Sequence, residues 1–376
     1  MFCQKQPTKD TQLGTRGPMI SKLGFGCLQL SLKPMPLEDK IQLILNAYKM
    51  GVTLFDTAAV YGKDRENEKT LGQALKKIDP KNVTIVTKCG ISFQAEAGNY
   101  FPQSEEDIRN SVDESLKNLG VDSIDVLLLH RIKPGAKHDD YVEPIAVMKQ
   151  LVLEGKVKHI GLSEATAEQI EHAVHIGPKE IGIDVVEIAY SLFTRRAERN
   201  GVKAMCEKYG IGILAYTSVI RGSIEPSLLD VLSREHVEAS DAKSLKTIFF
   251  KHTGISPFEQ TVGYFDDEYF KENLLCILDF LSIAKEYGIK PSTLALAWVI
   301  EQGIIPIPGT TNLKHLRDNV KAMSLDTKIA NIISEDMFPV DRFRGIPNPS
   351  RLSQFCEVTL ENYKRDTESH MSLKIT

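Results

Sequence analysis

The sequence predicts an α/β protein whose eight parallel strands close into a single-domain (β/α)8, or TIM, barrel. The first observation is the order of the segments, because short apolar runs alternate with helix-period segments between about residue 23 and residue 323. The second is their length, since each helical segment is long enough to cross between two parallel strands. An open doubly wound sheet is the alternative, but Gly24–Gln29 (GFGCLQ) departs from the G-x-G-x-x-G motif that usually follows its first strand. The barrel is therefore the expected fold.

The eight expected strands are short runs rich in β-branched and aliphatic residues, which is typical of strands buried on both faces. In chain order they are Leu23–Gly26, Thr53–Asp56, Thr84–Lys88, Asp125–His130, Ile160–Leu162, Asp184–Ala189, Ile213–Tyr216 and Ile304–Ile307.

Helices are expected between these strands and once after the last one. They are Leu37–Met50, Glu66–Lys77, Ser104–Leu119, Tyr141–Glu154, Ala167–His175, Glu198–Tyr209, Phe270–Tyr287 and Asn312–Met323. Several have start or stop signals. Thr166 and Gln169 fit a capping box, residues 105–107 place three acids in a first turn, and glycines at 51, 120 and 210 follow helix ends.

Two stretches depart from the repeating pattern. The crossover after the seventh strand, Gly222–Tyr269, is long and is expected to be irregular because it holds several prolines and glycines. Beyond Pro339 the chain runs on to a polar terminus. We therefore expect an N-terminal extension (1–18), a barrel (19–340) with a long substrate-side insertion (223–269), and a C-terminal extension (341–376).

The insertion follows the seventh strand, so a barrel would deliver it to the face on which the strands end. Its aromatic residues include Phe249, Phe250, Phe258, Tyr264 and Phe265. We expect it to fold over the barrel mouth together with residues 338–355 and to set substrate choice. A contact patch for another subunit is the alternative, since the same aromatic residues would serve it equally well.

Composition argues against several classes of protein. A formal net charge of −4 and a pI of about 6.2 give no support for nucleic-acid binding or a polybasic membrane contact. The longest apolar stretch, Leu274–Ala284, is interrupted by Asp279 and is much shorter than the roughly 20 residues of a membrane span. The first ten residues lack the apolar core of a signal peptide. We expect a cytoplasmic protein without membrane or nucleic-acid partners.

Neither a disulfide framework nor a metal site is expected. The six cysteines are scattered and form no C-x-x-C pair, so they are interpreted as buried or incidental thiols of a reducing compartment. His172 and His175 have a spacing that suits some metal sites, but no third ligand accompanies them. They are assigned to a helix face.

Four ionisable residues lie at or just after predicted strand ends. Asp56, Lys88 and His130 close the second, third and fourth strands. Tyr61 follows Asp56 by five residues, in a loop that ends at Gly62. Because parallel strands of a barrel end on one face, these side chains are expected to meet there. A carboxylate, a phenol, an ammonium and an imidazole together form a proton-transfer device.

The motifs around these residues resemble those of the aldo-keto reductase superfamily. The segment Gly51–Gly62 (GVTLFDTAAVYG) resembles the family signature around its catalytic aspartate and tyrosine. Further motifs follow in the family's order: Thr87-Lys88, Leu129-His130-Arg131, Gly161-Leu162-Ser163-Glu164, Tyr190-Ser191-Leu192, Ala215-Tyr216-Thr217-Ser218, Ile305–Thr310 (IPIPGT) and Asp318-Asn319. The similarity covers roughly Met19 to Pro339, and the Gly-Leu-Ser-Glu motif resembles the bacterial, plant and fungal branches.

This resemblance implies an NADP-dependent oxidoreductase that binds NADPH in extended form without a Rossmann motif. Tyr61 is assigned as the general acid, and as the base in the oxidative direction. A free tyrosine, with a pKa of about 10, is a poor acid near neutrality, so Lys88 is expected to lower that pKa by stabilising the phenolate. Asp56 would hold Lys88 charged and in place, and His130 would donate a hydrogen bond to the carbonyl oxygen.

The resemblance also implies a nicotinamide site. The ring would stack on Tyr216, and Ser163 and its neighbours would hold the carboxamide. Glu164 and Glu187 stand where many family members have an asparagine and a glutamine. An ionised glutamate at position 187 would add charge and could not donate to the carboxamide carbonyl. The seventh βα loop supplies the remaining residues assigned here: Thr217, Ser218, Val219 and Gly222.

Phosphate binding needs backbone N–H groups at a helix N-terminus more than it needs basic side chains. The residues assigned to this role are Gly309, Thr310, Thr311 and Asn312. Asp318 and Asn319 resemble the family's adenine-contacting pair. Only Lys314 and His315 remain to meet the 2′-phosphate, so a modest preference for NADPH is expected, with NADH as the second cofactor.

The leading hypothesis is an NADPH-dependent reductase of aldehydes, ketones or sugar-like carbonyl compounds. Two alternatives stay open. One is an NAD-linked dehydrogenase of a sugar lactol or polyol, since the same four residues work in both directions. The other is a non-catalytic binding protein like the potassium-channel auxiliary subunits, which share the barrel and the four residues. A small-molecule carbonyl substrate is the expected partner, and a homo-oligomer is compatible with the sequence.

Overall fold

The structure of the protein is a computed structural model that describes residues 11–94, 98–133, 135–255, 263–325, 333, 338–339 and 342–343. The contacts between residues divide the chain into two compact units. The first consists of Met1–Ile91, Phe101–Ile220 and Ser292–Val340, and the second of Ser92–Tyr100, Arg221–Pro291 and Asp341–Thr376. The domain boundaries expected from the sequence stay predictions, and the tail from residue 344 onward lies outside the described residues.

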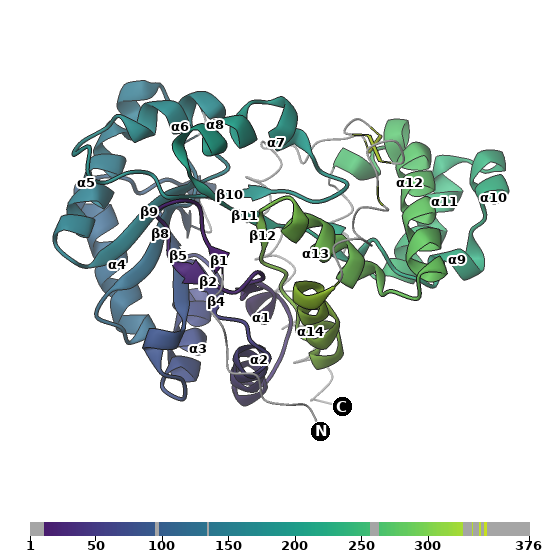
Figure 1. Cartoon of the computed structure of the whole chain (residues 1–376), viewed down its shortest axis with the longest axis horizontal. Helices are drawn as coiled ribbons and strands as arrows, with labels where there is room; N and C mark the ends of the chain where they lie inside the picture. The colour runs from purple at the N-terminus through teal and green to yellow at the C-terminus, as the bar shows by residue number, and fades with distance from the viewer. Residues whose placement is uncertain are drawn as a thin grey trace. The chain divides into compact units, whose positions relative to one another are not determined.

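The first unit is built on one eight-stranded parallel sheet, in the order β12-β11-β10-β9-β8-β5-β4-β3 (Figure 1). The strands are β3 (Phe25–Gly26), β4 (Leu54–Asp56), β5 (Thr84–Cys89), β8 (Ile124–Leu129), β9 (Val157–Ser163), β10 (Val185–Ala189), β11 (Gly212–Tyr216) and β12 (Ile305–Pro306). Hydrogen bonds from Gly24 N–H to Pro306 O (2.9 Å) and from Gly26 N–H to Pro308 O (3.3 Å) join the first strand to the last. The sheet thus curls back on itself, and the eight predicted strands are confirmed.

Helices cover the outside of this sheet (Figure 1). Those of the first unit are α1 (Gln29–Leu32), α2 (Leu37–Lys49), α3 (Glu66–Leu75), α4 (Glu105–Leu119), α5 (Val142–Leu153), α6 (Ala167–Val174), α7 (Arg196–Arg199), α8 (Val202–Tyr209), α13 (Pro291–Glu301) and α14 (Leu313–Val320). The predicted helices occur with shifted ends, whereas α1 and α13 are unpredicted. The helix expected at 198–209 is two helices, because Gly201 has a left-handed φ of 82° between them.

The capping signals in the sequence are used as predicted. Thr166 accepts a hydrogen bond from the N–H of Gln169, whose side chain accepts one in return from the N–H of Thr166. Ser104 and Asp107 make the same reciprocal pair at the start of α4. Gly120, with φ 68°, ends that helix in the left-handed conformation.

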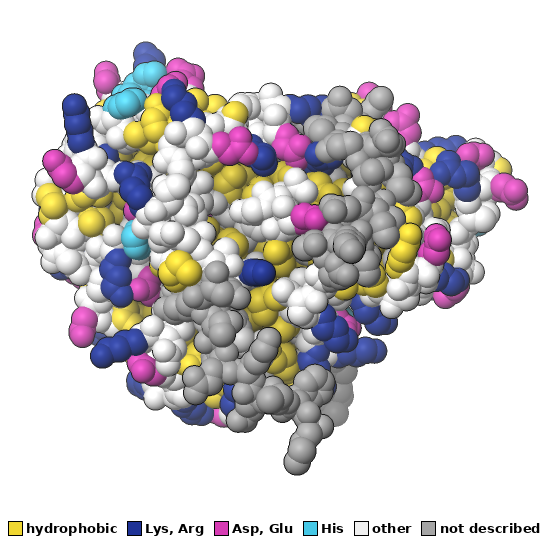
Figure 2. Space-filling view, in the orientation of Figure 1, with side chains coloured by type: hydrophobic (Ala, Val, Ile, Leu, Met, Phe, Trp, Pro, Cys, Tyr) yellow, Lys and Arg dark blue, Asp and Glu magenta, His cyan; other side chains and the backbone are white. Residues whose placement is uncertain are grey.

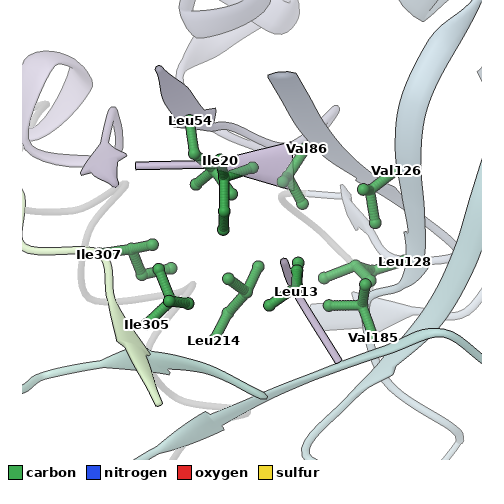
Figure 3. Close-up of a cluster of buried hydrophobic side chains, with 10 residues drawn as sticks. All are labelled: Leu13, Ile20, Leu54, Val86, Val126, Leu128, Val185, Leu214, Ile305 and Ile307. Atoms are coloured by element: carbon green, nitrogen blue, oxygen red, sulfur yellow. The ribbon is translucent and has the colours of Figure 1, made fainter. Parts of the chain in front are cut away.

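An unpredicted hairpin belongs to the first unit. Its strands β1 (Thr11–Gln12), which lies in the expected N-terminal extension, and β2 (Met19–Ile20), which lies at the start of the expected barrel, pair antiparallel. Leu13 and Ile20 contribute to a buried cluster with side chains from six barrel strands (Figure 3). The other members are Leu54, Val86, Val126, Leu128, Val185, Leu214, Ile305 and Ile307. The barrel interior is therefore a packed apolar core, to which the hairpin contributes.

The second unit contains a short antiparallel pair, β6 (Ser92–Gln94) and β7 (Gly98–Tyr100), and several helices. The helices are α9 (Leu228–Val231), α10 (Arg234–Ala239), α11 (Ala242–Thr253) and α12 (Asp267–Glu286). The prediction of an irregular crossover at 222–269 is thus wrong for its described part. Ser233 and Asp241 cap α10 and α11, and Gly254 ends α11 with φ 64°, so the breakers separate short helices.

The aromatic residues of this unit form its own core. Phe249 is completely buried, and its ring centroid lies 5.4 to 5.6 Å from those of Phe250, Phe265 and Phe270. Phe258 lies outside the described residues. A role of this segment in substrate choice, and the position expected for it over the barrel mouth, stay predictions.

Charged side chains are mixed on the surface. On the face shown in Figure 2, acidic and basic side chains alternate over the helices at the left of the view, as the small net charge suggests. Among the described residues, no helix combines the length and the apolar character that crossing a membrane requires.

Candidate active site

Three neighbouring strand ends bring the predicted catalytic side chains together. Asp56 is the last residue of β4, Lys88 is the next to last of β5, and His130 directly follows β8. The three strands are adjacent and parallel, so their carboxyl ends lie on one face of the barrel. Glu187, on β10, reaches the same group of side chains.

Lys88 is at the centre of this group. Its Nζ donates to Asp56 Oδ2 at 2.5 Å and to the carbonyl oxygen of Thr57 at 3.0 Å, and it lies 3.2 Å from Glu187 Oε2. The side chain of Lys88 is 0% exposed, and those of Asp56 and Glu187 are 4% and 5% exposed. A buried ammonium needs such partners, because burying an isolated charge costs several kcal/mol.

Tyr61 lies on the turn that follows β4. Its N–H donates to Ala58 O at 3.1 Å, and its carbonyl oxygen accepts from the N–H of Asn67 at 3.3 Å. Lys88 Nζ lies 5.2 Å from the centroid of the Tyr61 ring. The His130 ring meets the same ring edge-on, with 5.7 Å between centroids. The structure thus brings all four predicted side chains together, while their catalytic roles stay predictions.

Burial has the largest influence on the titration of these groups, although the rings of Tyr61 and His130 are only half-buried by surface area. Burial raises the pKa of Tyr61 well above its usual range, and Lys88 opposes this without reversing it. Lys88 thus acts in the expected direction on that pKa, but burial outweighs it. Burial, with help from Arg131 and Lys88, lowers the pKa of His130 well below 6.5. Burial also disfavours the Lys88 ammonium, but Asp56 and Glu187 outweigh it and raise the pKa of Lys88.

Glu187 differs from the ionised residue expected from the sequence. Burial and the neighbouring Asp56 carboxyl raise the pKa of Glu187 to about 8. The raised pKa favours the protonated form of Glu187 near neutral pH. A protonated carboxyl has an O–H donor, so this residue retains the donor that a glutamine would supply and adds no charge.

Arg131 is a site residue that the sequence did not predict. Its Nη1 donates to Ser163 Oγ at 2.7 Å and to the carbonyl oxygen of His130 at 2.9 Å. Because the Ser163 oxygen accepts this bond, the hydroxyl proton of Ser163 is available to a ligand. The signal for Arg131 was its position directly after a strand-end histidine.

Glu164 is held by the chain itself. It has a left-handed φ of 55°, a conformation that asparagine tolerates better than glutamate. Its carboxylate accepts from the N–H of Ala189 at 2.7 Å and from Arg196 Nη2 at 3.2 Å. These contacts stabilise the strained backbone and occupy both carboxylate oxygens. Its assigned role toward the carboxamide stays a prediction.

The end of β11 supplies the next group of predicted residues. Tyr216 is half-buried and packs against the apolar core cluster. Thr217 has a φ of 57°, and its buried Oγ1 has no hydrogen-bond partner among the described residues. The single hydroxyl proton of Ser218 faces the carbonyl oxygens of Tyr190 and Ala215, which lie 3.1 and 3.0 Å from Oγ, so this side chain anchors the loop. The neighbouring residue, Val219, is half-buried.

The start of α14 is arranged as a capped helix. Asn312 Oδ1 accepts from the N–H groups of Lys314 and His315, at 2.8 and 3.4 Å, and the N–H of Asn312 donates to Thr310 Oγ1 at 3.1 Å. Part of the N–H set expected to bind phosphate is thus already used within the loop. Thr311 is half-buried, whereas Lys314 and His315 are exposed.

Gly309, Asp318 and Asn319, which are also assigned to the cofactor site, are closely surrounded in this region. A Cβ at Gly309 would lie 2.7 Å from Gly26 O, so a side chain at that position would displace the neighbouring strand. Asp318 and Asn319 are 9% and 5% exposed, and Asp318 Oδ1 accepts from Lys321 Nζ at 2.7 Å.

Gly222 belongs to the second unit, where it has a φ of 91°. Its assignment to the cofactor site stays a prediction. A surface cavity of about 420 Å³ is present elsewhere in the first unit and includes none of the four catalytic candidates. It is lined by Phe101, Gln103, Ser104, Asp107, Lys133, Gly135, Ala136, Asp140, Glu143 and Pro144.

Among the described residues, neither a reactive thiol nor a metal-binding group forms a second candidate site. Cys27, Cys89, Cys206 and Cys276 are free and buried, and Cys3 and Cys356 lie outside the described residues. Burial raises the pKa of Cys89 to about 12, which keeps that thiol unreactive. Within the described ranges, no group of three or more histidine, cysteine, aspartate or glutamate residues could hold a metal ion.

Comparison with known proteins gives a consistent result. The model of the aldo/keto reductase family matches residues 22–335. The chain is 34% identical over 335 residues to "Probable aldo-keto reductase 1" from Glycine max, an overlap of 86% of this chain and 85% of that protein. It also resembles the crystal structure of a thermostable aldo-keto reductase in complex with the inhibitor epalrestat, with a TM-score of 0.60 and 23% identity. That similarity covers 86% of this chain and 98% of the other, and it shows a shared fold.

Proposed function

Because this chain belongs to the aldo/keto reductase family, we propose that it uses NADPH to reduce the carbonyl group of a small aldehyde, ketone or sugar-like substrate. Membership makes the chain an oxidoreductase of a family that works with nicotinamide cofactors. The substrate class, the use of NADPH and Tyr61 as proton donor form the proposal.

The proposal rests mainly on the arrangement of side chains around Lys88. Lys88 Nζ lies 2.5 Å from Asp56 Oδ2 and 5.2 Å from the Tyr61 ring centroid, and the His130 ring borders the same tyrosine. A phenol, an ammonium and an imidazole that lie next to one another can donate a proton to an oxygen placed beside them and stabilise charge on it.

Bound NADPH supplies the hydride that reduces the carbonyl carbon. Tyr61 donates its hydroxyl proton to the carbonyl oxygen. Tyr61 is protonated at neutral pH, which is the form that a general acid requires, but burial raises its pKa and so makes it a weaker acid.

Lys88 makes this proton transfer easier. As the phenol loses its proton, negative charge develops on the phenolate oxygen, and the nearby ammonium stabilises it. With ~5 Å between Nζ and the centre of the phenolate ring and an effective dielectric constant of ~20, a complete charge would be stabilised by about 3 kcal/mol, which sets an upper bound of roughly two powers of ten in rate. Asp56 keeps the ammonium in place through its hydrogen bond.

His130 acts as a neutral donor. Its lowered pKa keeps the imidazole uncharged at neutral pH, so one ring N–H is available to the carbonyl oxygen. A neutral donor orients the carbonyl group without competing with Tyr61 as a source of the proton.

The residues present fit a nicotinamide cofactor. Two buried polar atoms on neighbouring strands, Glu187 Oε2 within β10 and Thr217 Oγ1 just after β11, have no hydrogen-bond partner among the described residues, although Glu187 Oε2 lies 3.2 Å from Lys88 Nζ. Buried groups of this kind normally have one, so a polar ligand group at this place would complete them. The half-buried ring of Tyr216 offers a stacking face, and Ser163 offers a hydroxyl donor.

Binding of NADPH and NADH, measured by fluorescence, followed by turnover on a panel of aldehydes, ketones, sugars and pyridoxal, tests the proposal. We expect NADPH-dependent reduction of at least one carbonyl class. Faster NAD⁺-linked oxidation of a lactol or polyol would replace the proposal with a dehydrogenase. Tight cofactor binding without turnover in either direction would indicate a binding protein instead.

A further inference from the structure

The Lys88 ammonium has two carboxyl neighbours, and its single charge can balance only one of them. It donates to Asp56 Oδ2 at 2.5 Å, whereas Glu187 Oε2 lies 3.2 Å from Nζ without hydrogen-bond geometry. Both carboxyl side chains are at most 5% exposed. If both were ionised, the three side chains would carry a net negative charge in a buried place, which is costly.

We propose that Asp56 and Glu187 share one proton at neutral pH beside the Lys88 ammonium, and that Glu187 is a positioning residue whose charge state controls Tyr61 through Lys88. The shared proton follows from the geometry of the three side chains alone. The effect on Tyr61 rests on the proposed function.

Among the described residues, the remaining charged neighbour of Glu187 is Arg131, which could balance the excess negative charge in place of a proton. The charge of Arg131 is directed in part at the Glu164 carboxylate and not at Glu187 alone. Its Nη1 already donates to Ser163 and to the backbone of residue 130. Arg131 therefore leaves the excess negative charge around Lys88 largely unbalanced.

The titration of the group agrees with the geometry. Burial raises the pKa of Asp56, and burial together with the Asp56 carboxyl raises the pKa of Glu187 to about 8. Lys88 acts in the opposite direction on both. Two carboxyls that interact this closely titrate as a pair, so the proton belongs to the pair.

Loss of this proton would weaken the general acid. An ionised Glu187 raises the pKa of Tyr61 further, because its negative charge offsets the field of Lys88. Carbonyl reduction should therefore slow as the pH rises through the titration of the pair. Glu187→Gln cannot ionise and keeps the shape of the protonated acid, so it should remove this dependence.

The proton itself can be observed without turnover. Infrared spectra of the full-length protein without cofactor should show a carbonyl stretch of a protonated carboxylic acid near neutral pH, which is lost on titration through about pH 8. The band should be absent from Glu187→Gln. It should persist in Glu198→Gln, the matched control, because Arg195 holds both oxygens of Glu198 at 2.7 and 2.8 Å and the pKa of that acid is lowered. Absence of a titrating band from the wild type overturns the shared proton, and this measurement stands even if Glu187→Gln fails to fold.

Single-turnover reduction with saturating cofactor tests the second half of the proposal. The wild-type rate should fall by up to about tenfold per pH unit through the titration of the pair, and Glu187→Gln should show no such fall over the same range. Identical pH profiles would overturn the control of Tyr61. A titrating band without reduction of any carbonyl compound would refute the proposed function and leave the shared proton intact.

Discussion

Two groups of polar side chains at the strand ends of the barrel differ in how firmly the fold holds them. Around Lys88, two carboxyl side chains that are at most 5% exposed lie within 3.2 Å of the Lys88 nitrogen atom, which is itself buried. At the start of α14, Lys314 and His315 are exposed, and the Asn312 side chain already satisfies part of the helix end. Charges interact strongly where water is excluded and weakly where it is present. The first group is thus suited to drive chemistry, and the second to adjust cofactor affinity.

Tyr61→Phe should have the largest effect. It removes the proton donor from the buried group and leaves the residues at α14 untouched, so carbonyl reduction should be nearly abolished while NADPH affinity stays within a few fold. Steady-state and single-turnover rates on a slow, chemistry-limited substrate measure this. Retention of more than a tenth of the wild-type rate would contradict the assignment of Tyr61.

Two lysine variants test whether the group around Lys88 contributes more to protein stability than the exposed group at the start of α14. Lys88→Met removes the ammonium from two buried carboxyls and should lower the free energy of unfolding by about 3–5 kcal/mol near pH 8. The loss should be smaller near about pH 5, because protonation of Asp56 and Glu187 removes their charge in the folded protein. Lys314→Met removes an exposed charge and should change stability by less than about 0.5 kcal/mol.

Chemical denaturation at both pH values measures these differences. Equal effects of the two substitutions would show that Lys88 is not held by a buried ionic group.

The same Lys314→Met variant tests whether the exposed residues at the start of α14 determine the preference for NADPH over NADH. One charge-assisted contact with the 2′-phosphate of NADPH contributes about 1–2 kcal/mol, so the wild type should prefer NADPH to NADH by roughly 5- to 30-fold. The variant should lose most of that preference. Dissociation constants for both cofactors at one stated salt concentration decide this, and equal affinities in the wild type would remove the assigned role of Lys314.

The smallest expected effect concerns His130. Its pKa lies well below 6.5 in the folded protein, whereas the unfolded chain takes up this proton near pH 6.5. The unfolded state therefore binds more protons as the pH falls below about 6.5, and the contribution of His130 to stability decreases there by at most about 1.4 kcal/mol per pH unit. NMR signals of the His130 ring should stay constant between about pH 6 and about pH 8. A titration within this range would show that the imidazole is not held neutral.

Local patterns were sufficient for most of the barrel. A strand such as Thr84–Cys89 is buried along its whole length, so its apolar run identifies it without knowledge of its neighbours. The hairpin of β1 and β2 was missed because strands of two residues have no periodicity to detect. The sequence does not reveal the helices α9 to α11, because the prolines and glycines around them are typical of irregular structure, although here they only separate short helices.

By itself the sequence determined the order of the strands and helices and which side chains stand at the strand ends, since periodicity and position along the chain are local properties. Asp56, Lys88 and His130 could therefore be assigned to one face of a barrel from their positions in the chain. Only the tertiary structure decided the protonation of Glu187, the net effect on Tyr61 and the place of Arg131 beside Ser163. These properties depend on which charges are buried within a few ångströms of each other, and residues from β4, β5 and β10 come that close only when the barrel is formed.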